Sequence, residues 1–314
     1  MTAAIAPGRP VTSQPAKHPT IRRLTWVIVG ISILALAVIW AAGSAMTNGE
    51  RSSVAPPAAP ARNLRIRTPD GVLLAATYWP GVRPNSPAVL VLHGVGASRA
   101  ATAANAAWLA SRGYAALTID FRGHGESSMS TRSFGLRESV DAKTALHWMK
   151  REQGGAPVAV IGISMGGAAA LIGPDGPLPA DALILQAVYP DICHAIHDRI
   201  AARLGSLPAH LLEPLLSFQS LPRFGVRPSN LSPKRALPRF AGPVLVIGGV
   251  EDRHTPPDET RSLFAAARGP KSLWLVARGD HRAICDLGDN AYRARVADFL
   301  IKTVGDPRRL GKGN

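Results

Sequence analysis

The sequence predicts an α/β protein: a mostly parallel, twisted sheet with helices on both faces, preceded by one N-terminal transmembrane helix. Three observations support this prediction. Residues 24–42 contain no charged side chain, short apolar runs alternate with helical stretches from about residue 88 onward, and a lone serine follows one of these runs between two glycines. Alternating strands and helices are typical of parallel sheets that are buried on both faces.

The composition fits one globular domain with appended segments. The chain has 314 residues and 46% hydrophobic residues, enough for a full core. Its formal net charge of +15 is spread along the chain rather than gathered in runs, so we expect no nucleic-acid partner. Because it has no C-x-x-C motif and no Cys/His cluster, we expect no bound metal. The sequence leaves open whether Cys193 and Cys285 form a disulfide or remain thiols.

The N-terminal apolar segment is long enough to cross a bilayer, which needs about 20 apolar residues. We place the membrane anchor at residues 24–45, after a cytoplasmic tail at 1–23. Arg22 and Arg23 precede it, so the positive-inside rule predicts a cytoplasmic N-terminus and an extracytoplasmic domain at the cell membrane. The alternative is a cleaved signal peptide, because residues 43–45 read Gly-Ser-Ala, a small-residue cleavage pattern.

The remaining chain divides into a spacer, a domain and a short tail. Residues 46–62 are rich in proline and alanine and predict an extended, semi-rigid linker. The domain is expected at 63–304 and a C-terminal tail at 305–314. Its first element is a hairpin of strands at 64–68 and 72–79, with Pro-Asp-Gly at the turn.

The later elements follow in an alternating order. We expect strands at 88–94, 114–121, 158–162, 182–188, 243–249 and 272–277, and helices at 101–112, 136–153, directly after residue 164, at 257–267 and at 290–304. One interval, about 190–241, is too long for a simple connection and contains helical patterns. It predicts a small helical cap above the strand ends, where such sheets place their ligands.

Ser164 lies in the pattern G-x-S-x-G at a predicted strand-to-helix turn. Such a turn holds a serine hydroxyl out above the sheet, and the flanking glycines avoid collisions across the sharp bend. A serine nucleophile also needs a base, and the base needs a carboxylate to orient it.

Asp252 and His281 each follow a late predicted strand, so both are expected at the same edge of the sheet as Ser164. The chain order Ser, Asp, His is the one that this strand-turn-helix motif accompanies. Asp191, after an earlier strand, is the alternative acid. His254 is a poor candidate for the base because it lies only two residues from Asp252.

Together with LHGVGAS at 92–98 and DFRGHGES at 120–127, these motifs resemble the α/β-hydrolase superfamily over residues 63–304. Within it, the chain is similar to the membrane-anchored BEM46-like group, related to serine aminopeptidase-type and lysophospholipase-type members. The resemblance implies Ser164 as nucleophile, Asp252 as acid and His281 as base. It also implies an oxyanion hole made by the backbone N–H groups of Met165 and Val95, with Gly96 as the alternative to Val95.

The expected activity is hydrolysis of carboxylic esters, or related small-molecule acyl compounds, through an acyl-enzyme and without a cofactor. The same residues suit an exopeptidase or a thioesterase. A rival of another class is a non-catalytic binding protein on a hydrolase scaffold, because fold alone does not fix function.

Overall fold

The structure is a computed structural model that describes residues 4, 19–281 and 290–309. Its contacts divide the chain into two units, residues 1–41 and 42–314. Helix α1 (Pro19–Thr47) begins in the first unit and continues into the second. Its segment Arg22–Thr47 is long and apolar enough to cross a membrane, a property that signal sequences share.

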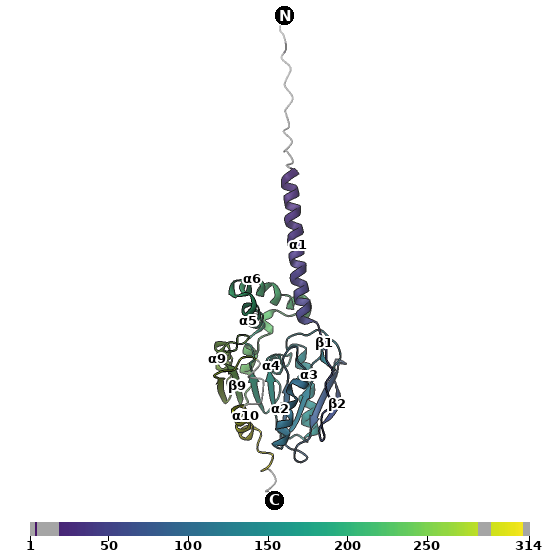
Figure 1. Ribbon diagram of the computed structural model, residues 1–314, viewed down its shortest axis with the longest axis vertical. Helices are drawn as coiled ribbons and strands as arrows, with labels where there is room; N and C mark the ends of the chain where they lie inside the picture. Colours follow the sequence, from purple (N-terminus) through teal and green to yellow (C-terminus); the bar gives the residue numbers. More distant parts are fainter. Residues whose placement is uncertain (1–3, 5–18, 282–289, 310–314) are drawn as a thin grey trace. The chain divides into compact units, whose positions relative to one another are not determined.

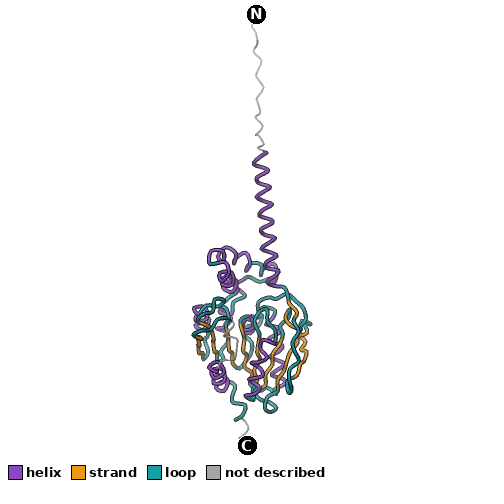
Figure 2. Tube along the Cα trace, viewed as in Figure 1, coloured by secondary structure: helices purple, strands orange, loops and turns teal. Residues whose placement is uncertain are grey.

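The second unit is built on an eight-stranded sheet (Figures 1 and 2). Its strands are β2 (Arg62–Arg67), β3 (Leu73–Trp79), β4 (Ala88–Leu92), β5 (Ala115–Ile119), β7 (Val158–Ile163), β8 (Ala182–Gln186), β9 (Val244–Gly249) and β10 (Lys271–Val276), in the spatial order β10-β9-β8-β7-β4-β5-β3-β2. The pairs β2/β3 and β3/β5 are antiparallel, and all other pairs are parallel. The predicted initial hairpin and mostly parallel sheet are confirmed.

Helices cover both faces of this sheet. The core on one face includes side chains of α2 (Ala100–Ser111) and α10 (Asn290–Thr303), and the core on the other face includes side chains of α3 (Glu138–Glu152), α4 (Met165–Leu171) and α9 (Pro257–Ala266). In β4, Leu90 and Leu92 join one core while Val89 and Val91 join the other. Both faces are therefore buried, which explains the uninterrupted apolar runs.

A group of helices lies between β8 and β9, in the interval where the sequence predicts a cap. It consists of α5 (Ile192–Leu204), α6 (Ser206–Ser217), α7 (Ser220–Phe224), η1 (Pro228–Asn230), α8 (Pro233–Ala236) and η2 (Leu237–Arg239). Helices α5 and α6 pack against each other. The chain reverses between them at Gly205, whose φ of 88° is accessible to glycine at little cost.

The proline-rich segment before the sheet is attached to the domain rather than lying apart from it. Its two-residue strand β1 (Glu50–Arg51) pairs in parallel with β6 (His124–Gly125). The N–H of Val54 also donates to Glu126 Oε1 at 3.1 Å. The expected spacer at 46–62 therefore includes residues that contact the loop after β5. The sequence does not predict this pairing, because a strand of two residues is too short to show a hydrophobic periodicity.

Candidate active site

Ser164 occupies the corner between β7 and α4, with φ 50° and ψ −115°. This backbone conformation is strained for a residue with a side chain. The turn leaves no room for a side chain at the glycines two residues before and after Ser164. A Cβ at Gly162 would lie 2.5 Å from Gly167 Cα, and one at Gly166 would lie 2.4 Å from the carbonyl oxygen of Leu92. The glycines of the motif are therefore required by backbone packing at this corner.

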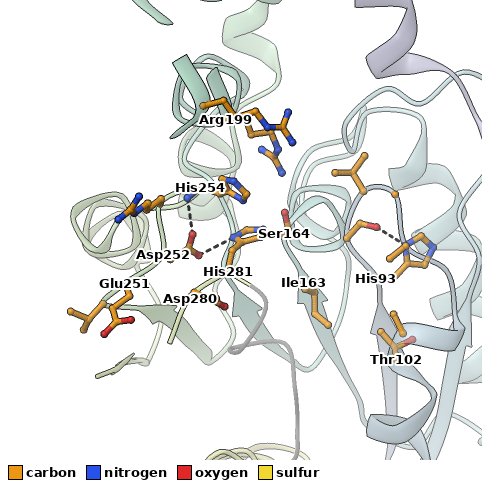
Figure 3. A pocket seen from close by; sticks show the side chains of 18 residues that line it. His93, Thr102, Ile163, Ser164, Arg199, Glu251, Asp252, His254, Asp280 and His281 are labelled. Atoms are coloured by element: carbon orange, nitrogen blue, oxygen red, sulfur yellow. Dashed lines mark hydrogen bonds and ion pairs between the residues drawn. The ribbon is translucent and has the colours of Figure 1, made fainter. Parts of the chain in front are cut away.

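The Ser164 hydroxyl faces a cavity of about 1180 Å³ at the carboxyl ends of the strands (Figure 3). Ser164 is 3% exposed, and its Oγ has no hydrogen-bond partner among the residues that the structure describes. Buried hydroxyls are normally hydrogen-bonded, so an unpaired one at a cavity wall indicates a group kept for a ligand or a reaction.

Asp252 follows β9, and its carboxylate is completely buried. Oδ1 accepts hydrogen bonds from the backbone N–H of His254 at 2.8 Å and of Thr255 at 3.0 Å, which fixes the orientation of the carboxylate. Oδ2 lies 2.8 Å from Nδ1 of His281 (Figure 3). Because a carboxylate only accepts, Nδ1–H is the donor, and Nε2 of the neutral imidazole is left as an acceptor.

His281 and Ser164 line the same cavity. The structure thus places the three residues singled out in the sequence around one space, with Asp252 hydrogen-bonded to His281. A hydrogen bond from Ser164 to the imidazole is not formed in this state. Catalytic hydrogen bonds are often long or poorly aligned before substrate binds.

His254 lies beside His281, with ring centroids 5.1 Å apart. Burial lowers the pKa of His254, and the neighbouring His281 and Arg199 add to this effect. The lowered pKa favours the neutral ring of His254, and its backbone N–H orients Asp252.

The loop after β4 forms the opposite wall of the cavity. His93 is fully buried, donates from Nδ1 to the carbonyl oxygen of Gly94 at 2.7 Å, and accepts at Nε2 from the N–H of Phe121 at 3.1 Å. Burial lowers the pKa of His93 to about 3, so its ring stays neutral and braces the loop. The loop passes close to the serine, since a Cβ at Gly94 would lie 3.5 Å from Ser164 Cβ.

Two backbone N–H groups beside Ser164 have no partner among the residues that the structure describes. Within the described part of the chain, the N–H groups of Val95 and Met165 make no hydrogen bond. Val95 lines the cavity from the loop after β4, and Met165 follows Ser164 directly at the start of α4. Gly96 lines the same cavity, so it stays an alternative to Val95. Paired free N–H groups at such a place suit a developing negative charge on oxygen.

A buried ion network around Arg99, a residue that the sequence analysis did not single out, holds this loop in place. The guanidinium of Arg99 binds Asp120 and, at 2.6 Å, Glu126, and the N–H of Arg99 donates to Asp120 Oδ1 at 2.6 Å. Asp120 is completely buried, so loss of its partner would leave an unpaired charge in the interior. The motif residues of 120–127 therefore support the loop rather than line the cavity.

A second, apolar cavity of about 370 Å³ adjoins the first. Residues of α5 form one side of this second cavity. Three residues line both cavities: Val95, Arg199 and Arg203. Met165, Tyr189 and Leu204 are among its other walls. The arginines are the site residues that sequence reasoning missed, although their spacing of four places them on one face of a helix.

Other sequence candidates lie elsewhere. Asp191 caps α5, accepting from the N–H of His194 at 3.1 Å, and does not line the cavity. No cluster that could hold a metal ion occurs among residues 4, 19–281 and 290–309. Cys193 lies on α5, whereas Cys285 is outside the described residues. A disulfide between them and two separate thiols therefore both stay predictions.

Known proteins share both the sequence pattern and the fold. The family model described as serine aminopeptidase, S33, matches residues 83–219. The chain is 29% identical over 192 residues to the uncharacterized protein YqkD of Bacillus subtilis, covering 60% of this chain and 62% of that protein. It is also 35% identical over 129 residues to the putative esterase YheT of Escherichia coli, or 38% of each chain.

Solved structures extend the likeness over most of the chain. An esterase of Pyrococcus furiosus matches with a TM-score of 0.63 at 22% identity, covering 83% of this chain and 99% of its own. An esterase of Exiguobacterium antarcticum matches with a TM-score of 0.53 at 17% identity, covering 76% and 97%. At such identities the likeness establishes the fold. Together with the family match and the strand-turn-helix corner at Ser164, it shows that this chain has the α/β-hydrolase fold.

Proposed function

We propose that this protein is a serine hydrolase that cleaves carboxylic esters through an acyl-enzyme on Ser164. The observation that supports this most is the unpaired Ser164 hydroxyl on the wall of the cavity that also holds the hydrogen-bonded pair of His281 and Asp252. Activation of a serine hydroxyl needs a base whose ring nitrogen can accept a proton, and the hydrogen bond of Nδ1–H to Asp252 makes Nε2 the accepting nitrogen of His281.

The reaction proceeds in two halves. Nε2 of His281 takes the proton of Ser164 as Oγ bonds to the ester carbonyl carbon, and the N–H groups of Met165 and Val95 bind the resulting oxyanion. The C–O bond to the alcohol then breaks, and the alcohol leaves with the proton from His281. Water attacks the acyl-enzyme by the same steps, which returns the proton to Ser164 and releases the carboxylic acid.

A peptidase is the second candidate, because the matching family model is described as a serine aminopeptidase. The same groups would attack an amide, with His281 delivering its proton to the leaving amine. The apolar lining of the cavity beside Val95 and Met165 favours an acyl chain over a charged amino terminus.

A panel of ester and amide substrates distinguishes the esterase from the peptidase. We expect the full chain in detergent to hydrolyse 4-nitrophenyl esters of short and medium acyl chains, with little release of 4-nitroaniline from aminoacyl amides. Ser164→Ala abolishes ester hydrolysis, whereas Ser98→Ala, a change in the neighbouring loop, retains it. Turnover of the amides without the esters would replace the esterase with the peptidase.

A further inference from the structure

The cap exposes a row of large apolar side chains along α6 and its flanking turns. Leu207, Leu211, Leu215 and Phe218 recur at intervals of four, four and three residues, so they share one side of the helix. With Leu204 and Leu221 they form the apolar face of the cap, and each of the six is 45 to 73% exposed.

The other side of α6 is packed inward. Ala209 and Ser217 are buried, and Leu216 packs against the main core. The helix is therefore apolar on both sides although only one side meets protein. Such a helix is expected where the second side meets another apolar phase.

The apolar face of the cap lies where the membrane-length segment joins the domain. Ser44, which belongs to the second unit, accepts a hydrogen bond at its Oγ from Arg223 of α7 at 2.9 Å. A Cβ at Gly43 would overlap the side chain of Gln219, which shows how closely the two segments pack. The segment that ends here is long and apolar enough to cross a bilayer, so chain connectivity brings any bilayer it enters to the side of α7.

The charges beside the apolar face favour an anionic surface. Arg203, Arg223 and Arg227 lie within residues 203–227, and Glu213 is the one acidic residue in that stretch of sequence. Exposed apolar side chains flanked by arginines are typical of segments that lie in the interface of anionic membranes.

The apolar cavity has walls in common with this face and with the cavity that Ser164 faces. Leu204 is a member of the apolar face and also a wall of the 370 Å³ cavity. Val95 is a wall of both that cavity and the one that Ser164 faces. An acyl chain that follows these walls passes from the outer surface of the cap to the candidate oxyanion donors.

We propose that the apolar face of the cap docks on an anionic lipid bilayer, and that the acyl chain of a lipid-borne ester enters the site through the cavity beside α5. The second part rests on the esterase function proposed above. The docking stands apart from it, because it concerns a surface remote from the reacting atoms.

A cross-linking experiment tests the docking without any assay of activity. The full chain is reconstituted into vesicles of phosphatidylcholine and phosphatidylglycerol, with p-benzoylphenylalanine replacing Leu211 or, as a control, Ile301. Ile301 is also an exposed apolar residue, on α10 at the other end of this unit from α6 (Figure 1). We expect at least fivefold more lipid adduct from position 211 than from 301. Equal lipid labelling at the two positions, or adducts of position 211 with a second copy of the chain alone, would overturn the docking.

An activity experiment tests the entry route. We expect the double change Leu211→Glu with Leu215→Glu to lower hydrolysis of 4-methylumbelliferyl oleate in these vesicles at least tenfold. Hydrolysis of water-soluble 4-nitrophenyl acetate stays within twofold, and Ile301→Glu leaves both rates unchanged. Equal losses on both esters, or no loss on either, would contradict the route. If the unaltered chain cleaves neither ester, the proposed function fails while the cross-linking result still decides the docking.

Discussion

Asp252 determines which nitrogen of His281 holds the proton. Its Oδ2 accepts from Nδ1, and its Oδ1 is held by two backbone N–H groups, so the carboxylate has little freedom to turn. Asparagine at this position would offer an N–H to the ring in place of an acceptor oxygen, which favours the wrong tautomer of the imidazole.

For Asp252→Asn we therefore expect a fall in kcat of about 10⁴-fold, with the structure retained. The measurement is ester hydrolysis together with thermal unfolding monitored by circular dichroism. Glu251→Gln is the matched control, since Glu251 is the exposed neighbour and also lines the cavity. A variant that folds normally and keeps more than a tenth of the activity would show that Asp252 is not the orienting acid.

At the scale of elements, the fold was more predictable than the contacts that complete the site. The strands were recognisable because both faces of the sheet are buried, and the corner at Ser164 was recognisable because its glycines cannot be replaced. The partners of Arg99 come from loops 21 and 27 residues away, a proximity that no local pattern encodes. In α6, leucines lie on every side of the helix, so the sequence does not indicate which side faces outward.

The contact between α5 and α9 should make stability depend on pH. Burial raises the pKa of Glu259 on α9 from 4.5 to about 8, and the charge of Asp198 on α5 adds to this effect. The unfolded chain loses this proton at the ordinary pKa, while the folded chain keeps it until about pH 8. Between these values the folded state binds more protons, so the free energy of unfolding falls as the pH rises.

Glu259→Gln should remove this fall in the free energy of unfolding with rising pH. We expect the variant to be more stable than the unaltered chain near pH 8, by on the order of 1 kcal/mol because solvent screens a half-buried group, and to gain little near pH 5. Urea unfolding at the two pH values measures this. Asp258→Asn, on the same turn of α9 and 98% exposed, should show no such pH dependence. A gain of equal size at both pH values would rule out titration of Glu259 as its cause.

At the scale of the whole molecule, the N-terminal helix is long and apolar enough to cross a membrane, a property that signal sequences share. Arg22 and Arg23 precede the apolar segment, so we propose that the chain is anchored with its N-terminus in the cytoplasm and its catalytic unit outside. The apolar face of the cap would then meet the outer leaflet of the same membrane.

Protease treatment of intact cells tests this orientation. With an epitope tag at the C-terminus, we expect the tag to be lost from intact cells while a cytoplasmic marker survives. Reversing the flanking charges with Arg22→Glu and Arg23→Glu should increase the protected fraction, because the orientation depends on these charges. A tag that is protected until the cells are lysed would place the catalytic unit in the cytoplasm.

Ser164 is the proposed nucleophile, and covalent labelling with a fluorophosphonate tests this role most directly. The probe phosphonylates an activated serine with loss of fluoride, and mass spectrometry of the peptides locates the adduct. We predict one adduct per chain, on the peptide that contains Ser164, and its absence from a folded Ser164→Ala variant. A folded, unaltered chain that stays unlabelled, or that takes the label on another residue, would contradict the account.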